Sequence, residues 1–263
     1  MLLRKLIVLA LGAVPGFASA GAWPMPEDDA QLIITNSRKA ASAEAVFQPD
    51  TEGTRSEISV FAEYGVTADT TLGLTIFAGY SAVDEDDIEL RVGGHVRHRF
   101  WTGEDGDVAS VELGASFPAE RWLGEGLGDN RPDSVSEVYL NLQYGRGWQF
   151  SWTDAFLSLG AEFRTRGEGQ DDELQFFGTG GLRPTDSLLV LFYTRWVRPL
   201  GPDGEETFDL SPSIAWTLNP WLGANDKKPE EEQRPTTLQF GITWDAHNPD
   251  DGFSVNFGVW KRF

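Results

Sequence analysis

The chain has no cysteine, three histidines and two methionines, and no long uncharged apolar run after its first residues. Without cysteine, an exported chain has no disulfide framework, so its stability must come from a core or from the closure of a sheet. A transmembrane helix needs about 20 consecutive apolar residues, and the lack of such a run excludes a helical membrane protein. Lys and Arg number 21 against 41 Asp and Glu, for a net charge of −20. This excess of acid argues against nucleic acid or another polyanion as a partner.

Residues 1–20 have the pattern of a secretory signal peptide. Arg4 and Lys5 form a basic start, residues 6–14 an apolar core, and Ala18-Ser19-Ala20 a small-residue cleavage site. The apolar core is too short to span a bilayer as a helix. We expect residues 1–20 to be removed, residues 21–29 to form an N-terminal extension, and residues 30–263 to form the folded domain.

The last eleven residues, FSVNFGVWKRF, alternate between two kinds of side chain. One face of the extended strand carries Phe253, Val255, Phe257, Val259 and Phe263, and the other carries Ser254, Asn256, Gly258, Trp260 and Arg262. A strand with one apolar face and a final aromatic residue is typical of the closing strand of a bacterial outer-membrane β-barrel. In such a barrel the apolar face meets lipid and the polar face meets a wet lumen.

The same period-two alternation recurs along the whole chain, and no convincing helical pattern appears. The predicted strands are residues 30–38, 55–66, 70–82, 87–101, 107–117, 134–148, 154–165, 171–183, 186–198, 206–218, 236–246 and 252–263. An even number brings both termini to the periplasmic side. The sequence therefore predicts an all-β fold, a transmembrane antiparallel up-and-down β-barrel of about 12 strands, integral to the Gram-negative outer membrane. One connection, residues 219–235, is long and polar for a periplasmic turn, so either it is a flexible tether or the count is wrong by two.

Aromatic residues near the strand ends favour a barrel over a secreted β-sandwich or jelly roll, which would also alternate. Tyr64, Trp101, Trp148, Trp216 and Trp260 lie near the ends of even-numbered strands, and Tyr80, Phe117, Phe163, Trp196 and Trp244 near the ends of odd-numbered ones. Two such belts are expected where amphipathic rings sit at the headgroup level of each leaflet.

Charge decides which face of each strand points inward, because a Lys or Arg on the lipid face near the midplane costs about 2–4 kcal/mol. The predicted pore-lining residues are Glu57, Glu63, Arg91, His95, Arg97, Arg99, Glu112, Glu162, Arg164 and Arg195. They either pair across neighbouring strands and brace the wall, at about 0.2–1 kcal/mol a pair, or orient a polar solute in transit. The predicted inward aromatic residues, which offer a stacking surface, are Phe61, Phe77, Trp101, Phe177 and Tyr193.

Several segments resemble successive blocks of one family. They are GAWPMPEDDAQLIITNS, EISVFAEYGVTADTTLGLTI, SEVYLNLQYGRGW, AFLSLGAEFRTRG, GLRPTDSLLVLFY and SPSIAWTL. The chain is similar here to the outer-membrane transporters grouped with the phenol-degradation meta-pathway proteins. The resemblance implies a barrel that moves small, often aromatic or hydrophobic, compounds, and it brings no catalytic or ligand residues. The chain departs from the family in its acidity and in residues 24–29, which hold two prolines and three acidic residues.

The predicted function is an outer-membrane channel or passive transporter for a small-molecule solute. The alternatives are a non-conducting structural or surface-interaction barrel and, less favoured, a lipid-modifying enzyme. We expect no catalysis, cofactor or metal. No nucleophile motif accompanies the three histidines, and their spacing is not that of metal ligands. The acidic runs are either solvated loops or weak divalent-cation sites.

The expected partners are outer-membrane lipids, lipopolysaccharide and the barrel-assembly machinery, which would recognise Phe263. The extension at residues 21–29 is expected to be either a plug in the barrel mouth or a disordered tail.

Overall fold

The computed structural model describes residues 22–40, 54–81, 88–119, 135–167, 169–202, 204–218, 236–249 and 252–263. These residues form twelve strands: β1 (Ala30–Ala40), β2 (Arg55–Thr67), β3 (Thr70–Ser81), β4 (Ile88–Thr102), β5 (Val108–Pro118), β6 (Glu137–Gln149), β7 (Asp154–Arg166), β8 (Glu173–Thr185), β9 (Leu188–Pro199), β10 (Thr207–Leu218), β11 (Thr236–Asp245) and β12 (Phe253–Arg262). The predicted signal peptide lies outside the described residues.

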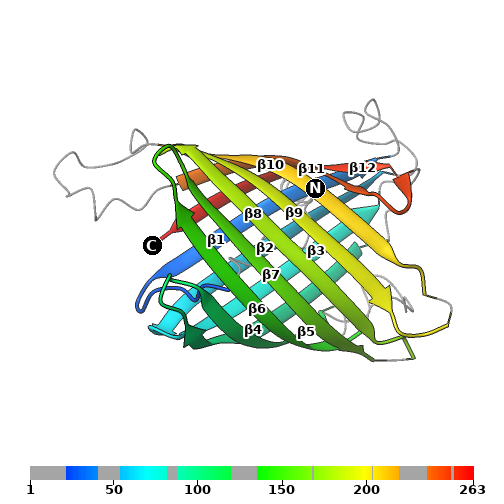
Figure 1. The fold of residues 1–263 in the computed structure, drawn as a ribbon. Helices are drawn as coiled ribbons and strands as arrows, with labels where there is room; N and C mark the ends of the chain where they lie inside the picture. The colour runs from blue at the N-terminus through cyan, green and yellow to red at the C-terminus, as the bar shows by residue number, and fades with distance from the viewer. Residues whose placement is uncertain are drawn as a thin grey trace.

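Each strand pairs antiparallel with its neighbours in the sequence, and β12 pairs with β1 to close the barrel. The closing pair runs from Gln31 opposite Arg262 to Ala40 opposite Phe253. Reciprocal backbone hydrogen bonds between Ala30 and Phe263 finish the seam. Figure 1 shows the strands inclined across the barrel wall, with the blue first strand and red last strand together. The predicted all-β architecture with twelve strands is confirmed.

Side chains alternate between a lipid-facing and a lumen-facing set, as the period-two pattern requires. On β5, for example, Leu113 is 57% exposed, whereas its neighbours Glu112 and Gly114 are on the lumen side and are buried. Large apolar side chains such as Leu142, Ile214 and Phe240 are exposed on the outer surface. This apolar surface is the one that a bilayer covers, so the barrel is an integral outer-membrane protein. Among the described residues, no helix has the length and apolarity needed to cross a membrane.

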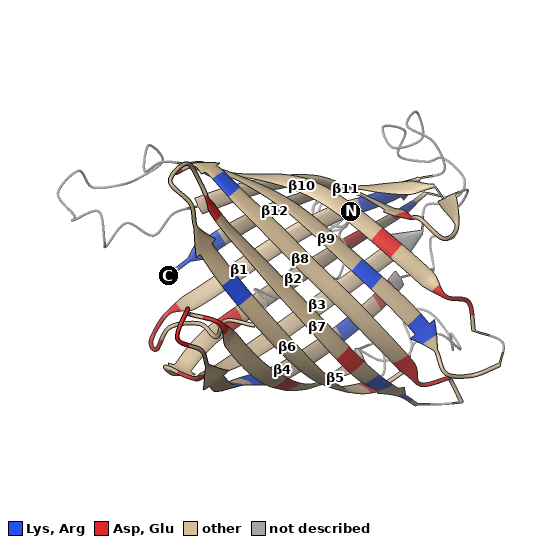
Figure 2. Ribbon diagram, in the orientation of Figure 1, with Lys and Arg blue, Asp and Glu red and all other residues tan. Residues whose placement is uncertain are grey.

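The two ends of the barrel differ in their connections. At one end, residues 68–69, 103–107, 150–153 and 186–187 join strands tightly, and β1 begins and β12 ends there. Short turns mark the periplasmic end of outer-membrane barrels. In Figure 2, acidic residues, drawn in red, lie in turns at both ends of the barrel. The connection 219–235 lies outside the described residues, but Leu218 pairs with Thr236 beside it, so the strand count there is right.

One aromatic residue differs from its predicted orientation, and a second differs only from its predicted place in an aromatic belt. A register shift between Arg99 and Trp101 turns Trp101 outward, opposite Ala109 on the lipid side, where it is 47% exposed rather than inside. Trp260 shares the lumen-facing parity of Asn256 and Gly258, and its indole nitrogen is buried, so it does not belong to the outer aromatic belt. A single-residue β-bulge is enough to reverse a side chain, and the alternation carries no signal of it.

The lipid-facing assignment predicts the effect of a charge at Leu113. Leu113→Arg places a cation at the middle of β5, so the free energy of unfolding in lipid vesicles should fall by about 2–4 kcal/mol. Denaturant titration followed by tryptophan fluorescence measures it. The control, Glu104→Arg in the exposed turn before β5, adds the same side chain outside the bilayer and should change stability little; equal losses in both variants would contradict the assignment.

Candidate functional site

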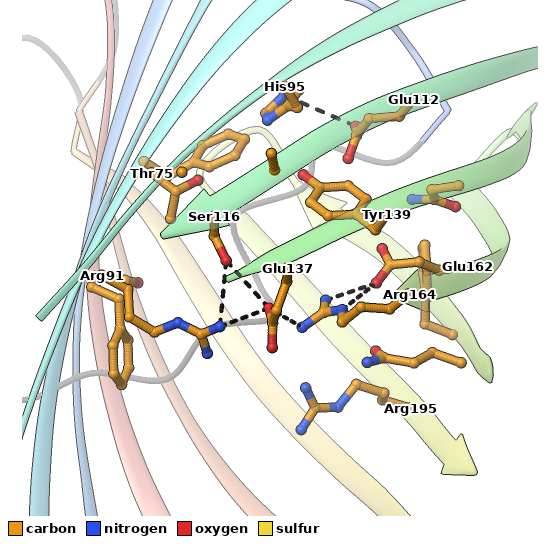
Figure 3. Close-up of a pocket in the computed structure, with 18 of the residues that line it drawn as sticks. Thr75, Arg91, His95, Glu112, Ser116, Glu137, Tyr139, Glu162, Arg164 and Arg195 are labelled. Carbon is orange, nitrogen blue, oxygen red and sulfur yellow. Dashed lines mark hydrogen bonds and ion pairs between the residues drawn. The ribbon is translucent and has the colours of Figure 1, made fainter. Parts of the chain in front are cut away.

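The candidate site is a cavity of about 430 Å³ in the lumen, lined by residues of β2 through β9. Its charged lining residues, including Arg55, Arg91, Glu137, Arg164 and Arg195, come from the strand ends farthest from the termini. The cavity therefore occupies the outer half of the barrel. Figure 3 shows Arg91, Glu137, Arg164 and Arg195 converging from several strands on one space.

Ion pairs form a continuous ladder along one side of the cavity. The Arg55 guanidinium lies 2.9 Å from Glu57 and 2.6 Å from Glu89. Arg91 contacts Glu89 at 3.8 Å and Glu137 at 2.8 Å. Each cation therefore lies between an acid on its own strand and an acid two strands away.

Glu137 is the centre of this ladder. Its carboxylate receives Arg91 at 2.8 Å, Arg164 at 3.1 Å and Arg166 at 3.7 Å, and the Ser116 hydroxyl donates to it at 3.2 Å. Figure 3 shows Arg91 and Arg164 reaching it from opposite sides. The Glu137 side chain is only 6% exposed, and a carboxylate so buried needs these partners to offset its desolvation.

A second cluster is buried at the floor of the cavity, nearer the periplasmic end. Arg97 has no exposed side-chain surface; it contacts Glu63 at 2.9 Å, and its Nε donates to Glu112 at 2.8 Å. His95 lies beside the same two acids, at 3.4 and 3.9 Å, and stacks on Phe61 with 5.5 Å between ring centroids. Two carboxylates thus share one guanidinium and one imidazole in the interior.

The N-terminal residues before β1 lie against this cluster. The Arg97 Nη1 donates to the Trp23 carbonyl at 3.4 Å, and the Met25 amide donates to the Thr71 hydroxyl at 2.8 Å. The Ala22 amide donates to the Ser158 hydroxyl at 3.3 Å. All three partners are lumen-facing residues of the barrel wall, on β4, β3 and β7. Residues 22–25 therefore lie inside the lumen, below the cavity.

A tight turn at residues 26–29 directs the chain inward. The Asp29 amide donates to the Pro26 carbonyl at 3.1 Å, and Asp28 has a positive φ of 62°. Asp tolerates this left-handed conformation better than most residues, and the Asp28 side chain also accepts a hydrogen bond from the Tyr64 hydroxyl at 2.9 Å. Asp29 pairs with Arg262 of the last strand. Gly65 is required beside the turn, because a Cβ there would collide with the Pro26 backbone.

The structure brings most of the predicted pore-lining residues to one cavity. Its lining includes Glu57, Arg91, His95, Arg97, Glu112, Glu162, Arg164 and Arg195. Glu63 lies behind the lining, fully covered, as a partner of Arg97. Arg99 lies apart at the periplasmic rim, where it pairs with Asp69 in the β2–β3 turn at 2.5 Å.

The sequence pattern places Glu137 among the inward residues but does not reveal its role at the centre of the ladder. Glu137 has inward parity on β6, but parity alone does not reveal that three arginines meet there, because Arg91, Arg164 and Arg166 come from two other strands. The inward aromatic residues Phe61, Phe77, Phe177 and Tyr193 also line the cavity, with Tyr139 added.

The three histidines have different surroundings. His98 hydrogen-bonds with the Thr70 hydroxyl at 3.1 Å near the periplasmic end, and the His247 amide donates to Asp245 in an outer connection. Among the described residues, no group of three or more His, Asp or Glu side chains is placed to hold a metal ion.

No protein-family model matches the chain, and neither does any protein of curated function. Among solved structures it is similar to an outer membrane channel from Pseudomonas putida F1, with 14% identity and a TM-score of 0.51 over 95% of this chain and 99% of that one. It is also similar to the KdgM porin, with 8% identity and a TM-score of 0.50 over 89% and 99%. LpxR from Salmonella typhimurium has 8% identity and a TM-score of 0.50 over 88% and 99%. At these identities the likeness establishes the outer-membrane barrel fold.

The buried cluster predicts a large difference between two arginines of one strand. Arg97→Ala leaves Glu63 and Glu112 buried without their main cation, so it should lower the free energy of unfolding by about 3–5 kcal/mol. Arg99→Ala removes a rim pair with the half-exposed Asp69 and should cost no more than about 1 kcal/mol. Guanidinium titration of both variants measures the difference, and similar costs would refute the contrast between core and rim.

Proposed function

We propose that the protein is a passive outer-membrane channel or transporter for small solutes. The observation that carries the proposal is the cavity of about 430 Å³ within the outer half of the lumen. A barrel of about eight strands is filled by its own side chains, and wider barrels leave room for a ligand or a channel. Here the cavity is lined by charged and aromatic side chains together, which suits a solute that is partly polar.

The N-terminal segment is the proposed plug of this channel. Residues 22–25 occupy the lumen below the cavity, and three hydrogen bonds join them to the wall. The bond between Arg97 and the Trp23 carbonyl is long, at 3.4 Å, and such a segment can leave without breaking the barrel. Solute in the cavity would reach the periplasm when residues 22–25 move aside.

Two further features support parts of this proposal. The resemblance to the phenol-degradation meta-pathway transporters favours an aromatic or hydrophobic solute, and the rings of Phe61, Phe77 and Phe177 in the cavity are compatible with one. Phe263 pairs through its backbone with Ala30 at the closing seam and its ring is exposed, as a signal read by the barrel-assembly machinery must be. The end of the barrel that lies in the outer leaflet would contact lipopolysaccharide.

The two competing functions have less support. An enzyme that acts on lipid needs an activated nucleophile at the outer leaflet, whereas His95 is buried among carboxylates and His98 lies at the periplasmic end. A non-conducting structural barrel would explain the ion-pair ladder but not the cavity beside it.

The proposed plug is tested by single-channel recording in planar bilayers. Deletion of residues 21–27 keeps Asp29 and its pair with Arg262, and it should raise the single-channel conductance severalfold because the periplasmic half of the lumen opens. Trp152→Ala, which removes an exposed aromatic side chain from the β6–β7 turn, is the matched control and should leave conductance unchanged.

Two outcomes would contradict the proposal. If the deletion variant conducts no more than the intact barrel, the segment is not the plug. If both remain silent although heat-modifiable gel mobility shows them folded, the channel itself is refuted and the structural barrel is favoured.

A further inference from the structure

Two inward aromatic rings in this barrel, those of Phe177 and Tyr139, lie over the neighbouring strand instead of projecting into the lumen. Phe177 is the direct cross-strand partner of Gly160, and its outer ring atoms occupy the space that a Cβ of Gly160 would need. Tyr139 stands in the same relation to Gly114. Glycine leaves room for a ring from the neighbouring strand. The rings therefore line the lumen with their faces and do not fill it.

On the strand that follows each ring, the cross-strand partner of the aromatic residue is an arginine. The register places Gly160, Phe177, Arg195 and Asp209 in one row across β7 to β10. It places Gly114, Tyr139, Arg164 and Glu173 in a second row across β5 to β8. The order is the same in both rows: glycine, aromatic ring, arginine, acid. The Arg164 guanidinium lies 5.6 Å from the Tyr139 ring centroid.

Within these rows the cations are more exposed to the cavity than the acids. The Arg195 side chain is 30% exposed against 17% for Asp209, and Arg164 is 24% exposed against 14% for Glu173. Arg195 donates to Asp209 from Nε and Nη2, so its Nη1 is the nitrogen that points away from that pair. In Figure 3, Arg164 and Arg195 extend toward the same space. A solute in the cavity thus meets ring faces and guanidinium N–H groups first.

We propose that this wall binds planar aromatic carboxylates, with the solute ring on the Phe177 ring and its carboxylate at Arg195. Aromatic rings prefer offset-stacked or edge-to-face contacts with another ring, and the planar guanidinium fork matches a carboxylate. The proposal deepens the proposed function by naming the solute class, and it rests on that function only for transport, since binding is measured separately.

The affinity should be low, because the wall is electrically balanced. The cavity lining holds the cations Arg55, Arg91, Arg97, Arg164 and Arg195 and the acids Glu57, Glu89, Glu112, Glu137 and Glu162. A carboxylate therefore competes with resident acids for each guanidinium. Weak binding is what passage requires, since a solute must also leave. We expect dissociation constants of the order of millimolar.

Four probes separate the features of the ligand. Benzoate is planar and anionic; cyclohexanecarboxylate has the same charge and similar size but no flat ring; benzyl alcohol has the ring without the charge; acetate has the charge alone. Binding to the purified folded barrel is measured by saturation-transfer NMR and calorimetry. Cyclohexanecarboxylate also controls for detergent, because it enters micelles at least as well as benzoate.

Two variants test the residues of the first row. Gly160→Ala keeps every aromatic and charged side chain but pushes the Phe177 ring off the wall, so it should weaken benzoate severalfold and leave acetate unchanged. The double variant Arg195→Gln with Asp209→Asn removes the cation without leaving its acid unpaired, and it should reduce the preference for benzoate over benzyl alcohol. Gly180→Ala is the control, because a Cβ there has open space around it; gel mobility confirms that each variant is folded.

The expected result is that benzoate binds severalfold more tightly than each other probe and that Gly160→Ala removes this preference. Equal binding of benzoate and cyclohexanecarboxylate, binding unaffected by Gly160→Ala, or no binding of benzoate would each overturn the proposed solute class. A barrel that conducts ions yet ignores benzoate would refute the ligand and leave the channel standing. A silent barrel that binds benzoate would refute the channel and leave the site.

Discussion

The structure depends on one constraint, the need to close a hydrogen-bonded sheet inside lipid. Within the bilayer every backbone N–H and C=O must find a partner in the protein, so β12 has to return to β1, and the seam ends in reciprocal bonds between Ala30 and Phe263. The outer face must then be apolar. Because side chains alternate strictly, every charge carried by a strand within the bilayer is driven into the lumen. A chain with 24% charged residues therefore acquires a lumen rich in ions.

Because these charges are enclosed, the charged side chains in the lumen are arranged as ion pairs. An ion removed from bulk water loses hydration that only close partners replace, and Glu137 meets this need with three arginines. Farther from the outer mouth, less water is available and the need for partners is greater. There Arg97 has no exposed side-chain surface and contacts both Glu63 and Glu112. The same arginine donates to the Trp23 carbonyl. The contact that balances the deepest charges is thus also a contact with the N-terminal segment, so electrostatics and occlusion of the lumen are coupled at one side chain.

The architecture was predictable because the physics behind it is periodic. The cost of Arg on the lipid face decides the direction of Arg91, Arg164 and Arg195, and the structure places all three at the cavity. What alternation cannot reveal is anything that breaks the period or joins distant strands. The bulge beside Trp101 reverses one side chain, and the turn at Asp28 sends residues 22–25 into the lumen. Arg99 and Arg97 look alike in sequence, yet one meets a turn residue at the rim and the other a buried acid pair.

The width of the lumen is set by which residues stand opposite each other, as well as by the number of strands. With twelve strands the barrel lies between those filled by side chains and those with open channels, so the direction in which a bulky side chain lies decides whether space remains. A glycine opposite a ring-bearing residue lets the ring lie along the wall. This occurs at Gly160, Gly114 and Gly73, where the rings of Phe177, Tyr139 and His95 lie over the neighbouring strand. The glycines preserve the cavity and expose ring faces within it. Backbone positions with no side chain of their own therefore shape the one surface that a solute would touch.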